Sequence, residues 1–181
     1  MSRLIFLSTT LLTVSSFLLN SCKKVDQFTQ FNMDFNNEII IPSTIGINLP
    51  INILTPEMET NSESTFELND TRKDLIEEIR LTSLTISLQS PNGADFSFLE
   101  SISIYMNAQD LPEVEIAWSE NIPENAGNQI SLNVSGNDFK EYIKKDQFSL
   151  RVNTVTDEII TADHKIDISS SYFIDAKILG L

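Results

Sequence analysis

Apolar and polar residues alternate along most of the chain, and a period of two is typical of β-strands with one buried face. The clearest run carries its apolar residues at every second position: Ile45, Ile47, Leu49, Ile51 and Ile53. Pro50 interrupts this run, and its missing amide hydrogen favours the edge of a sheet. We therefore predict a half-buried edge strand here, with Leu49 in the core.

The same alternation predicts strands elsewhere along the chain, each with one apolar and one polar face. These stretches are residues 31–35, 84–88, 102–106, 114–118, 130–134, 148–152 and 166–178. Asn36 and Asn37 favour a turn after the first of them, before a short apolar stretch at 38–41. The last stretch is long enough for one bent strand, or for two strands that meet at 169–171. The pattern as a whole predicts about eight to ten strands.

Two short helices are predicted between the strands. Thr71 and Asp74 have the spacing of a capping box, and an apolar stripe follows at 75–79. Residues 135–138 supply cap residues for a second helix at 139–145. Residues 55–64 precede both predicted helices, and their acidic, turn-rich composition predicts a loop.

These elements predict an all-β fold: two antiparallel sheets packed face to face as a β-sandwich, with two short helices. A jelly roll and an immunoglobulin-like Greek key both fit the strand spacing. The length suits one core, and no repeat of about 20 to 50 residues is visible. We assign residues 28–181 to a single β-sandwich domain.

The first 27 residues have a different pattern. Arg3 precedes an apolar run from residue 4 to 19 that serine and threonine interrupt, and the small residue Ser21 comes just before Cys22. This is typical of a secretory signal peptide and not of a membrane span. We predict a signal peptide at 1–21 and a polar tether at 22–27.

Leu19, Ser21 and Cys22 resemble a bacterial lipoprotein signal, in which the cysteine is acylated and becomes the new N-terminus. The resemblance implies that Cys22, the only cysteine of the sequence, carries the lipid. Two or three acyl chains hold a protein on a membrane far more firmly than one myristoyl chain does. The protein is therefore expected to contact the membrane through this lipid.

The sequence Ser-Cys-Lys-Lys at 21–24 is similar to the signals of small Bacteroidetes lipoproteins, and the stretches 61–67, 71–75 and 155–158 have the same character. Lys23, in place of an aspartate after the cysteine, is similar to lipoproteins that are sent on to the outer membrane. The resemblance implies attachment to that membrane, on its periplasmic face or at the cell surface. It implies no activity.

The net charge narrows the range of partners. Twelve basic and 26 acidic residues give a formal net charge of −14. Such a chain is repelled by nucleic acid and by anionic lipid headgroups. We therefore predict no nucleic-acid partner and no membrane contact through the protein body.

The sequence offers little for catalysis. His164 is the only histidine, and acylation would remove Cys22 as a nucleophile. The chain has no Gly-x-Ser-x-Gly motif, and its five glycines form no phosphate-binding loop. We predict a non-catalytic protein without a cofactor or metal, with His164 in a loop or at a strand end.

Four residues are candidates for contact with a ligand or partner. Glu57, Glu59 and Glu63 lie in the acidic stretch, which lacks the Asp/Asn pattern and central glycine of a calcium loop. A solvated surface is the simpler interpretation of these residues, and they remain candidate contacts to a partner or an ion. Tyr105 is out of phase with its strand's apolar face and is a candidate sugar contact. Trp118 is in phase, and we predict that it lies in the core.

The sequence therefore predicts a lipid-anchored module of the cell envelope that binds or scaffolds an envelope protein. A carbohydrate-binding module of a glycan-uptake system is the main alternative. A glycoside hydrolase with paired carboxylates is a further alternative, although 26 acidic residues make a suitable pair uninformative.

Overall fold

The computed structural model of the protein describes residues 29–43, 48 and 50–177. The alternation of the sequence appears directly in its strands: Ile102, Ile104 and Met106 are buried, whereas the residues between them are partly exposed. The predicted signal peptide, the predicted lipid on Cys22, the whole tether at 22–27 and the core position predicted for Leu49 lie outside the described residues. No helix in the described part is long and apolar enough to cross a membrane.

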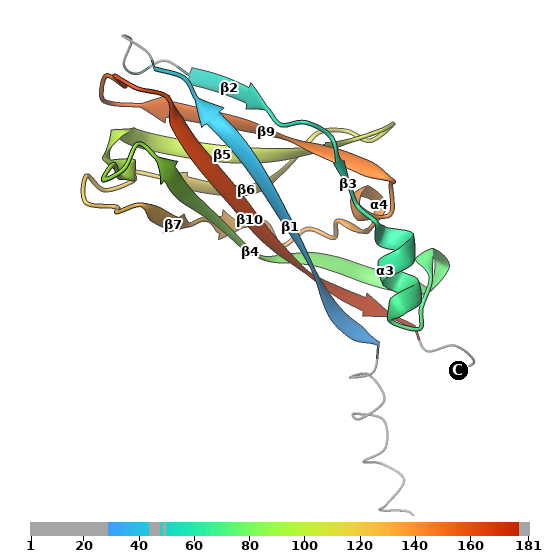
Figure 1. The fold of residues 1–181 in the computed structure, drawn as a ribbon. Helices are drawn as coiled ribbons and strands as arrows, with labels where there is room; N and C mark the ends of the chain where they lie inside the picture. Colours follow the sequence, from blue (N-terminus) through green and yellow to red (C-terminus); the bar gives the residue numbers. More distant parts are fainter. Residues whose placement is uncertain (1–28, 44–47, 49, 178–181) are drawn as a thin grey trace, which may run out of the picture.

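Strands dominate the described chain, as Figure 1 shows. The strands are β1 (Gln30–Ile41), β2 (Pro50–Leu54), β3 (Met58–Glu59), β4 (Ile76–Ser90), β5 (Leu99–Ala108), β6 (Val114–Glu120), β7 (Gln129–Ser131), β8 (Asn133–Val134), β9 (Gln147–Thr156) and β10 (His164–Ala176). The α-helices are α3 (Ser62–Leu68) and α4 (Lys140–Ile143), and the 3₁₀ turns are η2 (Lys73–Leu75) and η3 (Phe96–Phe98).

The strands form two antiparallel sheets, which confirms the predicted β-sandwich. The four-stranded sheet has the order β1-β10-β4-β7, and the six-stranded sheet has the order β2-β9-β5-β6-β8, with β3 also paired to β9. The described part of the chain changes sheet six times: between β1 and β2, β3 and β4, β4 and β5, β6 and β7, β7 and β8, and β9 and β10. An immunoglobulin-like sandwich keeps its first two strands in one sheet. This order is that of a jelly roll.

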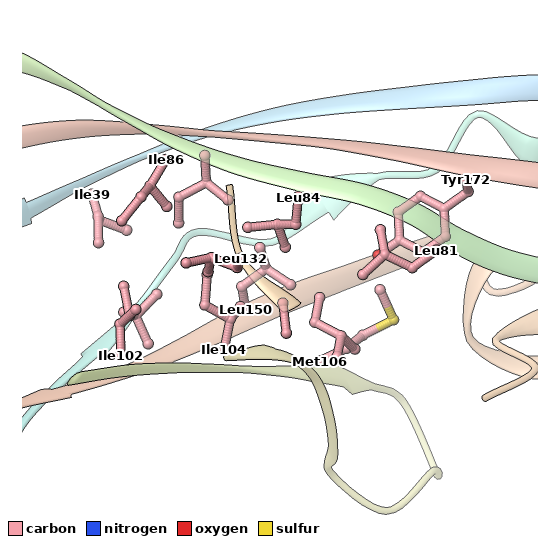
Figure 2. Close-up of a cluster of buried hydrophobic side chains, with 14 of the residues drawn as sticks. Ile39, Leu81, Leu84, Ile86, Ile102, Ile104, Met106, Leu132, Leu150 and Tyr172 are labelled. Carbon is pink, nitrogen blue, oxygen red and sulfur yellow. The ribbon is translucent and has the colours of Figure 1, made fainter. Parts of the chain in front are cut away.

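The hydrophobic core fills the space between the sheets. Figure 2 shows Ile39, Leu84 and Ile86 of the four-stranded sheet facing Ile104 and other side chains of the six-stranded sheet. Leu84, Ile86 and Ile104 are at most 1% exposed. Burial of each such side chain contributes about 1.5–3 kcal/mol, so this core is the main source of stability.

Four aromatic rings cross the core from one sheet to the other. The ring of Phe148 in β9 meets Phe35 of β1 edge to face, with centroids 5.1 Å apart. Phe35 contacts Tyr172 of β10 at 5.7 Å, and Tyr172 contacts Phe139 at 6.2 Å. Edge-to-face contacts of this kind add to the stability that burial alone provides. Burial also raises the pKa of the Tyr172 hydroxyl.

The predicted turn at Asn36 and Asn37 is wrong. Both residues lie inside β1, which pairs without a break along twelve residues of β10. The Ser169 hydroxyl donates a hydrogen bond of 2.8 Å to Oδ1 of Asn36. Continuous pairing along β10 outweighs the local preference of asparagine for turns. β10 is likewise one long strand, and its pairing with β4 is irregular at three points: 165/166, 171/172 and 175/176.

The predicted helix at 75–79 is also wrong, since β4 begins at Ile76 after a single 3₁₀ turn. Ile76 pairs with Ala176 and Glu78 with Asp175, so Glu77 is an extra residue in the ladder. This bulge places Ile76 and Ile79 on the same buried face although they are three residues apart. Two buried residues three positions apart are also typical of a helix, which explains the wrong prediction.

The first α-helix overlaps the end of the loop that the sequence predicted at 55–64, and the sequence did not predict it. α3 begins at Ser62, and its Phe66 is fully buried with the ring of Phe31 6.2 Å away. A single large aromatic side chain fixes this two-turn helix against the end of the sandwich, and the sequence around it shows no repeated apolar stripe. The second helix, α4, lies within the predicted range 139–145. The edge position predicted from Pro50 is confirmed, because β2 is the outermost strand of its sheet.

Candidate binding surface

The outer face of the six-stranded sheet carries side chains that alternate with the core residues. In Figure 2 the side chains of Ile102, Ile104 and Met106 of β5 lie in the core. Successive side chains of a strand point to opposite faces, so Ser103 and Tyr105 lie on the outer face. Both are partly exposed. The sequence prediction that Tyr105 lies outside the core agrees with this placement.

The prediction that Trp118 lies in the core is wrong. In the ladder between β5 and β6, Ile104 pairs with Ala117 but Tyr105 pairs with Glu115, which leaves Ile116 as an extra residue. Ile116 and Ala117 are consecutive and both fully buried. The bulge shifts the phase of the strand by one, as a single extra residue does. Trp118 therefore lies opposite Ser103 on the outer face and is partly exposed.

Arg151 of β9 is the centre of a polar network on this face. Its guanidinium lies over the ring of Tyr105, 4.1 Å from the centroid. Its Nε and Nη2 donate hydrogen bonds to the two carboxylate oxygens of Glu113, at 2.9 and 2.6 Å. Its Nη1 donates to Oδ1 of Asn52 in β2 at 2.9 Å, and Nδ2 of Asn153 donates to the same oxygen at 2.9 Å.

This network fixes side chains that would otherwise be flexible. A bidentate contact between arginine and a carboxylate sets the plane of both groups. The hydrogen bonds from Arg151 hold the pKa of the Glu113 carboxyl below its usual range, with a smaller contribution from Asn107. The Glu113 contact in turn raises the pKa of Arg151. The charges of Arg151 and Glu113 largely cancel. The network therefore holds its side chains in fixed orientations but adds little net charge to this face.

Trp118 has no such partner. Among the described residues, its indole takes part in no hydrogen bond and no ring contact. A partly exposed indole has a large apolar ring and one N–H donor available to another molecule. It is therefore the group on this face that is most available to a ligand.

The three acidic candidates do not form one site. Glu57, between β2 and β3, lines a hollow of about 740 Å³ with Asn107, Lys144 and Lys145. Glu59 and Glu63 line a second hollow of about 430 Å³ beside α3. Within residues 29–43, 48 and 50–177, no group of three acidic, histidine or cysteine residues is placed to hold a metal ion.

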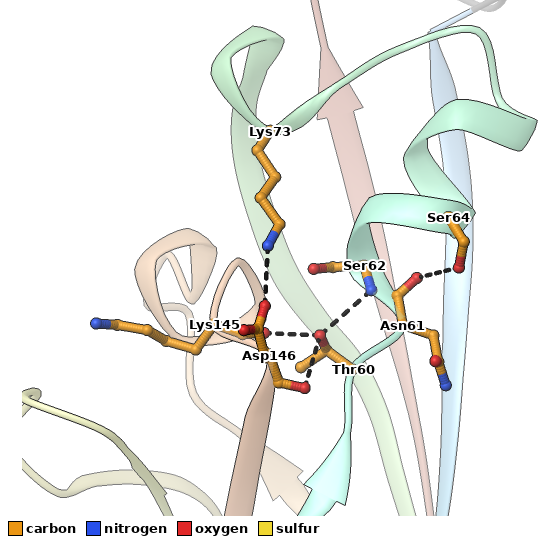
Figure 3. Close-up of polar contacts among 7 residues, drawn as sticks. All are labelled: Thr60, Asn61, Ser62, Ser64, Lys73, Lys145 and Asp146. Atoms are coloured by element: carbon orange, nitrogen blue, oxygen red, sulfur yellow. Dashed lines mark hydrogen bonds and ion pairs between the residues drawn. The ribbon is translucent and has the colours of Figure 1, made fainter.

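The second hollow is bordered by a polar connection between β3, α3 and β9 (Figure 3). The Thr60 hydroxyl donates to the carbonyl oxygen of Lys145 at 2.7 Å and accepts a hydrogen bond of 3.2 Å from the amide of Ser62. Nζ of Lys73 forms an ion pair with Asp146 at 3.3 Å. These contacts join elements of the sandwich to one another, which gives them a structural role.

The only histidine is held inside the sandwich. His164 begins β10 and is 9% exposed. Its ring lies 4.4 Å from that of Phe98, and its Nδ1 is 2.8 Å from the carbonyl oxygen of Ala162. The strand-end position predicted from the sequence is confirmed. Packing against an aromatic ring explains this histidine without a catalytic role.

Comparisons with known proteins give no assignment. No family profile matches the chain, and no curated protein matches it. Among solved structures, the crystal structure of FLHE is similar over 81% of this chain and 98% of its own, with 7% identity and a TM-score of 0.35. The decameric BFDV capsid protein is similar over 82% and 98%, with 5% identity and a TM-score of 0.37.

A structure of carbohydrate-binding modules from the β-sandwich superfamily is similar over 82% of this chain and 55% of its own, with 10% identity and a TM-score of 0.30. Likenesses of this size carry no information on function. The assignment of a function therefore depends on the residues of the chain itself.

Sequence reasoning identified Tyr105 but missed Trp118, Arg151 and its partners Asn52 and Glu113. The alternation in β9 does place Arg151 and Asn153 opposite to the apolar face, so that signal was present in the sequence. Their convergence with Asn52 was not visible, because β2 and β9 are about a hundred residues apart in the chain and pair only in the folded sheet.

Proposed function

We propose that the protein is a non-catalytic binding module, attached to the outer membrane of the cell envelope through acyl chains on Cys22, that binds its partner through the outer face of the six-stranded sheet. The observation that carries this proposal is the preorganised network of Arg151, Tyr105, Glu113 and Asn52 beside the unpartnered ring of Trp118. Tryptophan, tyrosine and arginine are the residues that contribute most to binding when they lie together.

Preorganisation supports binding more than catalysis. Ordering a flexible side chain costs about 0.5–1.5 kcal/mol on association, and that cost is already met in the unbound protein for Arg151 and Asn52. Glu113 is engaged by two hydrogen bonds from Arg151, which lower its pKa and so favour a charged carboxylate over a proton donor. The same residues that suit binding are therefore poorly placed for acid catalysis.

The anchor is tested with Cys22→Ala in the native host. We expect the unchanged protein to sediment with membranes, to be released by detergent, and to carry label from radioactive palmitate. The variant should lose the label, because no other cysteine is available for acylation. Cys22→Ser serves as a second variant with a side chain close in size. Label that persists in both variants would contradict the lipid anchor.

The binding surface is tested by comparing two arginines on opposite faces. Arg151 stacks on Tyr105, whereas Arg80 stacks on Phe173 of the four-stranded sheet, 5.4 Å from its centroid. After cross-linking in cells, the protein with Arg151→Ala should capture at least about tenfold less protein or polysaccharide than the protein with Arg80→Ala. Each variant loses one arginine, so net charge cannot explain a difference.

Equal capture by the two arginine variants would show that the outer face of the six-stranded sheet is not the contact surface. Loss of capture on charge reversal of Glu57, Glu59 and Glu63 would assign the contact to the acidic segment instead. Turnover of an ester, peptide, phosphate or glycoside substrate that disappears when an acidic residue is replaced would contradict the non-catalytic proposal.

A further inference from the structure

One row of side chains crosses the six-stranded sheet without a charge. Trp118 of β6 pairs with Asn133 of β8 on one side and with Ser103 of β5 on the other. Ser103 pairs with Asn153 of β9, which pairs with Asn52 of β2. Residues directly opposite in a ladder lie on the same face. Across five strands the row therefore consists of Asn133, Trp118, Ser103, Asn153 and Asn52, none of which is charged. The whole chain, by contrast, has a net charge of −14.

The polar end of this row is already oriented. Oδ1 of Asn52 accepts hydrogen bonds from both Arg151 and Asn153, at 2.9 Å each. Those bonds fix the plane of the Asn52 amide and occupy its oxygen. Among the described residues, the Asn52 amide nitrogen and the Asn153 amide oxygen take part in no other hydrogen bond. The end of the row thus offers three N–H donors, two from Asn52 and one from Asn153, and one acceptor oxygen to solvent.

We propose that this row binds a neutral glycan chain laid across the strands, and the proposal rests on the outer face being the binding surface of the module. The indole of Trp118 stacks against the C–H face of one sugar ring. The amides of Asn52 and Asn153 exchange hydrogen bonds with hydroxyls of another sugar farther along. Strands lie about 4.8 Å apart, so the indole and the Asn52 amide are separated by roughly 14 Å.

The chemistry of the row favours a polyol over a protein. A protein interface has a fully desolvated, apolar centre, whereas four of the five side chains here are amides or a hydroxyl. Sugar hydroxyls both donate and accept, which matches the mixed donors and acceptors of the row. Glu113 largely balances the charge of Arg151 beside the row, and the flanking Glu115 and Glu120 oppose an anionic chain.

The outer face of the four-stranded sheet provides an internal comparison. It carries five carboxylates and two basic side chains: Asp34, Glu38, Glu78, Asp167 and Asp175, with Arg80 and Lys165. Its partly exposed Phe173 is covered by the guanidinium of Arg80. An aromatic side chain is thus present on both outer faces. Phe173 lies under a guanidinium, whereas Trp118 is partly exposed in an uncharged row and has no ring or cation contact among the described residues.

The test is affinity electrophoresis of the full chain, purified in detergent, through gels that contain starch, mixed-linkage β-glucan, xylan, mannan, alginate or polygalacturonate. We expect retardation by at least one of the four neutral polysaccharides and by neither acidic one. Trp118→Ala should weaken that binding by about tenfold or more. Asn52→Asp, which replaces the free amide donors with a carboxylate, should weaken it as well. Phe173→Ala should bind like the unchanged protein.

The proposal is overturned if none of the neutral polysaccharides retards the protein, if only the acidic ones do, or if Trp118→Ala binds unchanged. The melting temperature of each variant is measured alongside, and Trp118→Phe, which keeps an aromatic ring, should retain part of the binding. Absence of glycan binding, together with loss of envelope-protein capture in Arg151→Ala, would reject the glycan and retain the surface. Equal capture by Arg151→Ala and Arg80→Ala would instead reject the surface itself.

Discussion

Phe148→Ala should lower the free energy of unfolding by about 3–5 kcal/mol. The Phe148 side chain is 2% exposed, and its ring meets Phe35 edge to face at 5.1 Å across the two sheets. Truncation removes buried apolar surface and leaves a cavity that neighbouring strands, held by their ladders, cannot close. Urea unfolding followed by circular dichroism measures the change.

Trp118→Ala is the matched comparison for Phe148→Ala. Trp118 is partly exposed on the outer face, so we expect its truncation to cost about 1 kcal/mol or less. The sequence pattern alone would have predicted a loss as large as that of Phe148. An equal loss of stability in the two variants would show that Trp118 is a core residue and that the bulge at Ile116 is misplaced.

Thr55→Val should cost about 1–3 kcal/mol although the two side chains have the same shape. Thr55 is 4% exposed and lies between β2 and β3. These two strands pair one after the other with β9. Its hydroxyl oxygen accepts a hydrogen bond of 2.8 Å from the amide of Leu150. Valine offers no acceptor, so this buried amide of β9 is left without a partner.

A second threonine provides the control for this effect. The Thr156 hydroxyl is fully buried and has no hydrogen-bond partner among the described residues. Thr156→Val should therefore be nearly neutral or stabilising, since it removes an unsatisfied polar group. Thr55→Ser should retain most of the stability that Thr55→Val loses. Equal costs for the two valine variants, in the same unfolding experiment, would contradict the role of Thr55.

The phase of a strand, meaning which of its residues face the core, followed from the sequence where the ladder is regular and was misread where the ladder contains a bulge. The phase of β5 and β9 was correct because each apolar residue is followed by one polar residue. In β6 the extra residue Ile116 reversed the phase, and in β4 the extra residue Glu77 imitated a helical spacing. In a bulge, two residues of one strand lie opposite a single residue of the partner strand. Its position therefore depends on how two strands pair, and the sequence of one strand alone does not specify it.

The candidate surface was predictable in part for the same reason. Tyr105 lies in a regular part of β5, so its outward position could be read from the period of two. The contact between Arg151 and Asn52 depends on pairing between β2 and β9, which local patterns do not specify. The choice between a jelly roll and an immunoglobulin-like sandwich also depends on such pairing, and strand order settled it.

The unbroken ladder between β1 and β10 has a mechanical consequence. β1 is the edge strand of its sheet, and its twelve residues pair in register with β10 from Gln30 to Ile41. A force that pulls Gln30 along the strand axis loads all of these pairs together in shear, so they must break together. The same force applied across the strand would open them one after another, like a zipper. If the proposed lipid anchor holds the chain at Cys22, tension on the protein would reach this ladder through Gln30 and would load it along the strand axis, in shear.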